Sequence, residues 1–157
     1  MTKNRYYAKL AQAKIQKVEL GELQDLEKLI NEIKSDRKKV SQAGSKSRGH
    51  TTDAANEDKI IVKMQKELDI RKDRKLDMIK KANAVKLDLI DALQSMEAKM
   101  MRADKIIQGM RVVEKDLGVT VPGIKSASQD LENSYDVWQD GKDDYDFVSK
   151  IINNMKR

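Results

Sequence analysis

The chain has 157 residues, which is about the length of one domain, and 37% of them are charged. Aromatic residues make up 4%, and there are one proline and seven glycines. Strands draw on aromatic and β-branched residues and alternate with Gly and Pro turns, so we exclude an all-β fold and an α/β sheet. The absence of cysteine excludes disulfides, cysteine-ligated zinc and thiol catalysis.

The formal net charge of +6 is unevenly distributed along the chain. Residues 34–81 hold 15 basic and eight acidic side chains, whereas residues 126–157 hold four basic and seven acidic ones. A basic region attracts nucleic acid, and a chain with one basic and one acidic region can align identical subunits head to tail. A solvated, lysine-rich helical surface explains the same charges, because acids at i,i+4 spacing neutralise many of them locally.

The first expected element is a helix over residues 4–40. Its apolar side chains fall at steps of three and four residues in Leu23, Leu26, Ile30 and Ile33, a spacing typical of a helical hairpin or coiled coil. Residues 41–57 follow without any large apolar side chain and collect Gly, Ser, Thr and Asn. We therefore predict a mobile, protease-sensitive loop there.

The second expected element is a helix of about 65 residues over 53–117, a count that follows from its uninterrupted, proline-free sequence. Its heptad-like stripe includes Met78, Met96, Met100 and Met110, and we interpret the cluster of Met96, Met100, Met101 and Met110 as core filling rather than as an adaptable binding face. Gly118 follows Leu117 as a C-terminal cap, and Pro122 prevents continuation. A turn over 118–123 is the expected result.

The last expected element, a helix over 124–156, has the most regular pattern in the sequence. Large residues recur every seven positions in Ile124, Leu131, Trp138, Tyr145 and Ile152. Small residues occupy the offset register as far as Gly141, and the period passes through this glycine without losing phase. We predict that the five large residues form one interaction seam, buried within the chain or across a subunit interface.

These lengths predict an all-α fold and a single elongated helical domain over residues 1–157. The first helix would fold back over one half of the central helix and the last over the other, giving a long antiparallel helical hairpin or coiled-coil rod. A rod only two helices thick leaves apolar surface half covered, so we expect the protein to complete it as a homo-oligomer or with a helical protein partner.

The basic loop is the candidate nucleic-acid surface. Candidate phosphate contacts precede it in Lys34, Arg37, Lys38 and Lys39, lie within it in Lys46 and Arg48, and follow it in Lys59, Lys63 and Lys66. In a hairpin these side chains would converge on one tip, where lysine and arginine could neutralise phosphates. No helix-turn-helix signature and no aromatic interleaving accompany them, so only non-specific binding is expected.

Nothing in the sequence predicts catalysis, a metal site or a cofactor. The only histidine, His50, has no second histidine or cysteine to form a site with, and the aspartates of residues 136–146 fail the EF-hand pattern. No nucleotide-binding, hydrolase or metalloprotease motif occurs, so we predict a protein that is not an enzyme and that takes no small-molecule substrate. No apolar run reaches a membrane span of about 18 residues. We expect a soluble intracellular protein, cytoplasmic or part of a large assembly such as a virion.

Two functions fit this sequence. The first is a non-catalytic coiled-coil structural or adaptor protein that acts by self-association or by docking to a larger assembly. The second is a nucleic-acid-binding accessory protein of the small, oligomeric DNA-packaging type, which would use residues 34–81 to contact phosphates without sequence specificity.

Overall fold

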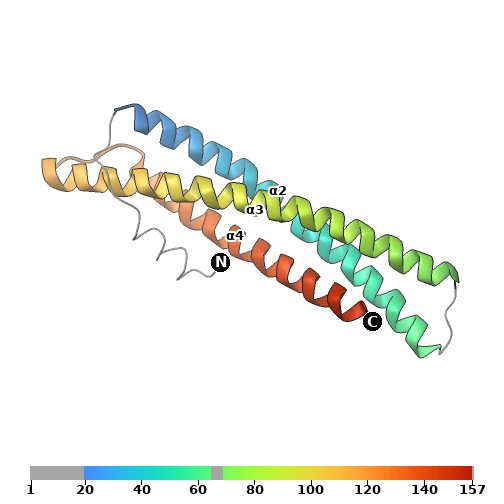
Figure 1. Ribbon diagram of the computed structural model, residues 1–157. Coiled ribbons are helices and arrows are strands. Elements are labelled where there is room, and N and C mark those ends of the chain that lie inside the picture. The colour runs from blue at the N-terminus through green and yellow to red at the C-terminus, as the bar shows by residue number, and fades with distance from the viewer. Residues whose placement is uncertain (1–19, 65–68, 157) are drawn as a thin grey trace. The chain divides into compact units, whose positions relative to one another are not determined.

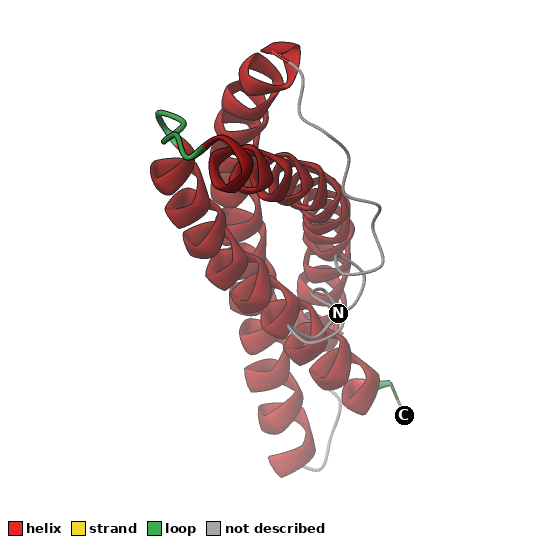
Figure 2. Cartoon of the chain, turned by 90° about the vertical axis from the view of Figure 1, so that its left-hand side faces the viewer, coloured by secondary structure: helices red, strands yellow, loops and turns green. Residues whose placement is uncertain are grey.

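The computed structural model describes residues 20–64 and 69–156, and all its regular structure is helical (Figures 1 and 2). Helix α2 spans Leu20–Lys63, α3 spans Asp69–Leu117 and α4 spans Ile124–Met155. The prediction of an all-α fold is confirmed, because the described residues contain no strand. None of these three helices combines the length and the apolarity that crossing a membrane requires.

The prediction of a loop over residues 41–57 is wrong. These residues are helical throughout and belong to α2, which continues to Lys63. The prediction of a 65-residue helix over 53–117 is wrong for the same reason: α3 begins at Asp69 and has 49 residues. The first helix therefore extends past residue 40. Its expected part before residue 20 lies outside the described residues. Lys66, one of the candidate phosphate contacts, also lies outside them.

The helix through residues 41–57 is explained by its buried side rather than by intrinsic propensity. Gly, Ser, Thr and Asn are poor helix formers, but buried residues recur at steps of four and three in Val40, Gly44, Ser47, Thr51, Ala54 and Asp58. Small side chains can fill a helical seam when the neighbouring helices approach closely. Residues 41–57 contain no large apolar side chain that would mark this seam in the sequence.

The turn between α3 and α4 lies where the sequence places it. Helix α3 ends at Leu117, and Gly118 follows with a φ of 62°. The amide of Val119 donates to the carbonyl of Glu114 at 3.2 Å, which is the six-residue hydrogen bond of a Schellman cap. Gly123, with a φ of 85°, precedes α4 and accepts a hydrogen bond from the amide of Ala127. Both glycines adopt backbone angles that other residues rarely reach.

Contacts divide the described chain into two compact units. Unit 1 consists of residues 20–38 and 93–139, so each of the three helices contributes a segment to it. Its core is built from large apolar residues: α2 contributes Leu26, Leu29, Ile30 and Ile33, and α3 contributes Met96, Met100, Ile107 and Met110. The core role predicted for these three methionines is confirmed, while Met101 is half-buried.

Unit 2 consists of residues 39–64, 69–92 and 140–156, again from all three helices. Its core cluster contains Ala54, Ala82, Val148, Ile152 and Met155. Ser47 donates to the carbonyl of Ala82, and Arg71 pairs with Glu57, so α3 runs antiparallel to α2 in this unit. The expectation that the whole chain forms a single domain stays a prediction.

Candidate functional site

The predicted basic tip does not exist as a loop. Its described residues lie along α2 instead, between Lys34 and Lys63. A helix turns by about 100° per residue, so Lys59 lies about 200° around α2 from Lys39. Lys39 and Lys46, seven residues apart, share one side of the helix, whereas Lys59 and Lys63 lie on another. The structure therefore separates these side chains into smaller groups.

Arg48 and Lys34 are engaged in contacts between helices. In unit 2, Arg48 forms a salt bridge with Asp144, and its guanidinium lies 4.2 Å from the centre of the Phe147 ring. In unit 1, Lys34 lies 3.4 Å from the carboxylate of Asp130. Both contacts join α2 to α4. They give these two cations a structural role that competes with the predicted contact to phosphate.

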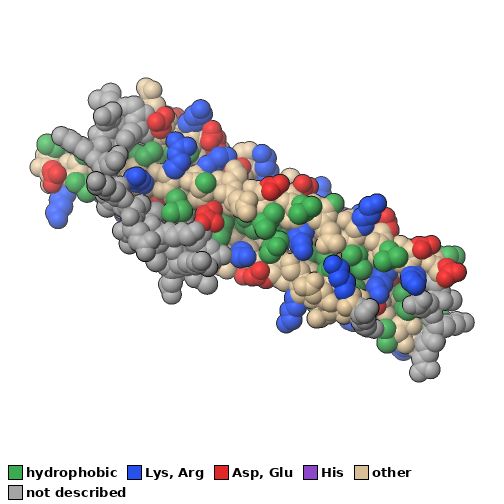
Figure 3. All heavy atoms as spheres, in the orientation of Figure 1, with side chains coloured by type: hydrophobic (Ala, Val, Ile, Leu, Met, Phe, Trp, Pro, Cys, Tyr) green, Lys and Arg blue, Asp and Glu red, His purple; other side chains and the backbone are tan. Residues whose placement is uncertain are grey.

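The other described lysines of the set are exposed. In unit 2 these are Lys39, Lys46, Lys59 and Lys63, and in unit 1 Lys38 is exposed beside the half-buried Arg37. Within residues 20–64 and 69–156, none of these five lysines lies within 4.0 Å of a carboxylate oxygen in a salt bridge. On the visible face of the molecule, however, basic and acidic side chains are interspersed (Figure 3).

The predicted seam of α4 is buried in unit 1. Ile124, Leu131 and Trp138 are all less than a tenth exposed, and the offset position Ser134 is buried with them. The Trp138 ring lies 6.0 Å from the ring of Tyr135, and its indole nitrogen has no hydrogen-bond partner among the described residues. This part of the seam therefore contributes to the interior of unit 1.

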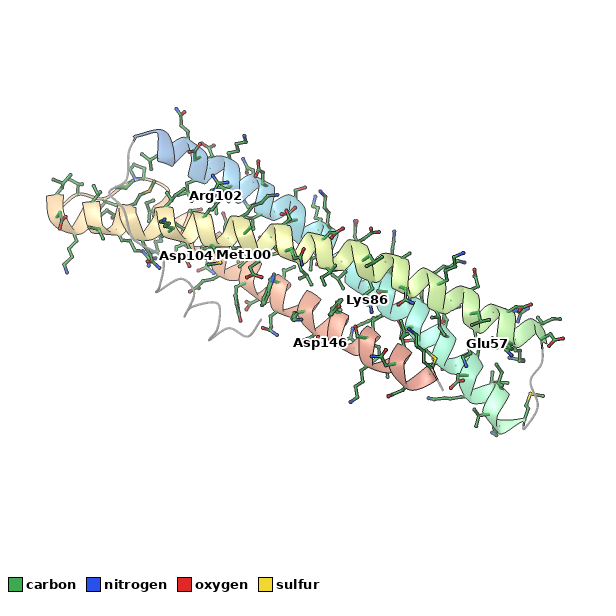
Figure 4. All side chains as sticks on the ribbon, viewed as in Figure 1. Glu57, Lys86, Met100, Arg102, Asp104 and Asp146 are labelled. Atoms are coloured by element: carbon green, nitrogen blue, oxygen red, sulfur yellow. The ribbon has the colours of Figure 1, made fainter. Side chains whose placement is uncertain are left out.

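The seam continues less uniformly in unit 2. Ile152 is buried in the core cluster, whereas Tyr145 is half-buried. The Tyr145 ring has the ammonium groups of Lys86 and Lys142 at 5.4 and 5.1 Å from its centre. Lys86, labelled on α3 in Figure 4, also donates to the hydroxyl of Ser149 at 3.4 Å. Gly141 is helical and buried, so it does not interrupt α4.

Buried polar groups are the feature that the sequence analysis missed. In unit 1, the buried carboxylate of Asp36 accepts from Lys99 at 2.9 Å and from Ser95 at 3.1 Å. In unit 2, Asp58 pairs with Lys75 at 2.6 Å. Each pair joins α2 to α3 and fixes which turn of one helix faces the other. The spacing of residues 40, 44, 47, 51, 54 and 58 was the signal that could have revealed this polar seam.

Asp104 is an acidic residue of α3 whose pKa differs clearly from its ordinary value. Burial within unit 1 raises the pKa of this carboxyl above its usual value, and the positive charge of Arg111 opposes the shift. Figure 4 shows Asp104 on α3 near Met100 and Arg102. Acid–base catalysis needs further groups around such a carboxyl, and across residues 20–64 and 69–156 no three His, Cys, Asp or Glu side chains are grouped so that they could hold a metal.

Two surface hollows flank the turn before α4 in unit 1. One has a volume of about 540 Å³ and lies between the start of α2 and the start of α4, with Leu26, Ile30 and Ile124 among its mainly apolar lining residues. The other, of about 530 Å³, is lined by Arg111, Lys125 and neighbouring polar residues. The second hollow is also lined by Glu114, Ser128 and Glu132, and Arg111 donates to the Ser128 hydroxyl at 2.7 Å.

The comparisons with known proteins add no assignment: no family model, curated protein or solved structure matches this chain.

Proposed function

We propose that this protein is a non-catalytic structural or adaptor protein that acts by helix packing with a second copy of itself or with a larger assembly. The observation that carries the proposal is an exposed apolar pair on α3 in unit 2. Leu76 is 55% exposed and Leu87 is 63% exposed. They are 11 residues apart, which is about three helical turns, so both lie on the same side of α3.

The polar interior supports the same proposal. Asp36 and Asp58 form interhelical ion pairs, and Ser47 donates to a backbone carbonyl of α3. Such groups hold helices in one register, which is what a packing element requires. The coiled-coil rod expected from the sequence belongs to this proposal, and small-angle X-ray scattering of the full chain tests it through the maximum dimension.

Sedimentation equilibrium tests the self-association directly. The wild-type protein at tens of micromolar is expected to exceed the monomer mass of 17.9 kDa. The double variant Leu76→Glu/Leu87→Glu should shift towards the monomer, because charges at a helix interface must be desolvated. Val62→Glu, which changes an exposed apolar residue of α2, is the matched control and should leave the mass unchanged. A wild-type monomer at these concentrations would contradict self-association.

The second candidate function is non-specific binding of nucleic acid. It is favoured by the exposed lysines Lys39, Lys46, Lys59 and Lys63 in unit 2. Phosphate binding releases counterions, so the logarithm of affinity should fall with the logarithm of salt concentration by about 0.9 per contacted phosphate. Fluorescence anisotropy with duplex DNA measures this slope.

Variants separate a phosphate contact from a general effect of charge. If the lysine side chains bind phosphate, Lys39→Gln/Lys46→Gln should reduce the salt slope by about two. Lys150→Gln, which removes an exposed lysine from α4, should leave the slope within error. Absence of binding at low salt would eliminate this function and leave the structural proposal untouched.

A further inference from the structure

We infer that residues 41–58 of α2, named here the α2 strap, detach from α3 and α4 of unit 2 as a local unit while the rest of the protein stays folded. The strap lies wholly in unit 2. Its detachment would expose the apolar side chains that it covers, so the strap would control access to the interior of this unit. The inference concerns a motion within one chain and does not depend on the proposed function.

The first observation is the small size of the strap's own buried side chains. Its buried residues are Gly44, Ser47, Thr51, Ala54 and Asp58, and none has an apolar side chain larger than that of alanine. Stabilisation by burial scales with apolar area. The strap's own buried side chains therefore contribute less hydrophobic attachment than those of the α2 segment in unit 1, where Leu26, Leu29, Ile30 and Ile33 are buried together with Asp36.

The second observation is low helix propensity. Residues 41–58 contain two glycines, five serines and threonines, and one asparagine at position 56, besides several charged residues. Glycine and the short polar residues each cost a helix several tenths of a kcal/mol to about 1 kcal/mol relative to alanine. Intrinsic propensity therefore does not compensate for the weak burial, and the strap depends on its contacts with α3 and α4.

The third observation is that polar contacts fasten the strap. Arg48 pairs with Asp144 of α4, and on the α3 side Glu57 and Asp58 pair with Arg71 and Lys75. The Arg48–Asp144 and Glu57–Arg71 pairs are partly exposed, so salt screens them, whereas the Asp58–Lys75 pair is largely buried and is screened less. One polar group of the strap is buried without compensation. Thr51 is fully buried, and its hydroxyl has no hydrogen-bond partner among the described residues.

The surface beneath the strap is apolar. Ala54 and Ala55 of the strap pack with residues of α3 and α4 that include Met78, Ile79, Val148, Ile151 and Ile152. These side chains would face water when the strap is detached. Local opening of this kind has a free energy below that of global unfolding, and it leaves a direct signature in hydrogen exchange.

Hydrogen exchange followed by mass spectrometry tests the inference on the full-length protein. Protection factors, which correct for the fast intrinsic exchange of serine and glycine amides, should be at least about tenfold lower in residues 41–58 than in residues 24–37. Raising sodium chloride from 0.05 to about 0.5 M should lower protection in the strap further. Equal protection in the two segments would overturn the inference.

A pair of variants adds a matched test. Thr51→Val removes the unpartnered hydroxyl at nearly constant shape, so protection in the strap should rise about tenfold. Thr52→Val makes the same chemical change at an exposed neighbouring position and should change protection less than about twofold. Equal effects of both variants would show that the buried polar seam does not control opening, and would contradict the inference.

Discussion

In unit 1, α2 packs through Leu26, Leu29, Ile30 and Ile33, whereas in unit 2, beyond the buried Val40, the same helix packs through Gly44, Ser47, Thr51 and Ala54. One continuous helix thus uses two kinds of buried surface. Large side chains stabilise through the area they remove from water. Small ones permit close approach and leave interhelical polar contacts to fix the register. Helix continuity here does not imply uniform stability along the helix.

The largest expected effect is the loss of a large side chain from unit 1. Ile33 is 1% exposed, so Ile33→Ala should lower the free energy of unfolding by about 2–5 kcal/mol. Leu23→Ala, at a position that is 37% exposed on the same helix, is the control and should cost much less. Urea denaturation measures both. Similar losses for the two variants would mean that Ile33 does not anchor unit 1.

A second pair of variants tests the close approach in unit 2. A Cβ on Gly44 would lie 3.1 Å from Cγ and 3.3 Å from Cβ of Asp144, the partner of Arg48. A Cβ on the exposed Gly49 would meet nothing within 4 Å. Gly49→Ala should therefore stabilise the protein by about 1 kcal/mol through helix propensity.

Gly44→Ala gains the same propensity but crowds Asp144, so it should be less stable than Gly49→Ala by about 1–3 kcal/mol. Thermal unfolding of both variants against the wild type gives this difference. Equal stabilisation by the two substitutions would show that the contact between α2 and α4 accommodates a methyl group at Gly44 without crowding Asp144. The polar seam would then not require a glycine at this position.

The sequence predicted the elements whose signals are local and regular. The seven-residue period of Ile124, Leu131 and Trp138 marked α4, and Gly118 with Pro122 marked the turn before it. It did not predict the helix over residues 41–57, because the small residues of that seam resemble a loop when taken without their neighbours. The end of α2 near Lys63 was missed because no glycine or proline marks it.

The same distinction between local and non-local signals applies to the candidate sites. The buried positions of the α4 seam followed from their period, but the ion pairs of Asp36 with Lys99 and of Arg48 with Asp144 join residues more than 60 positions apart. Such partners depend on which helices are adjacent. Composition and local spacing contain no information about that.

A smaller effect concerns the buried acid of unit 1. Burial raises the folded-state pKa of Asp104 above its ordinary value of 3.8. Over the pH range between the two pKa values, this carboxyl therefore keeps its proton in the folded state and has lost it in the unfolded state. Stability should therefore fall as pH rises from about 3.8 through the folded-state pKa, and this contribution should be constant above it.

Asp104→Asn removes this titration while keeping the shape of the side chain. The variant should be at least as stable as the wild type at neutral pH, and the difference between them should shrink on acidification. Urea midpoints measured from pH 3.5 to 7 provide the comparison. A variant that is less stable at pH 7 and equally stable at pH 3.5 would reverse the sign and show that the ionised carboxylate is favourable in the fold.

The contrast between the two segments of α2 depends most on residues 41–57 being helical. Backbone NMR assignment of the full-length protein measures this through the Cα chemical shifts. The structure predicts helical shifts without interruption from residue 24 to residue 62, including Gly44, Gly49 and the serines between them. Random-coil shifts over 41–57, between two helical stretches, would contradict the account and restore the loop that composition alone predicts.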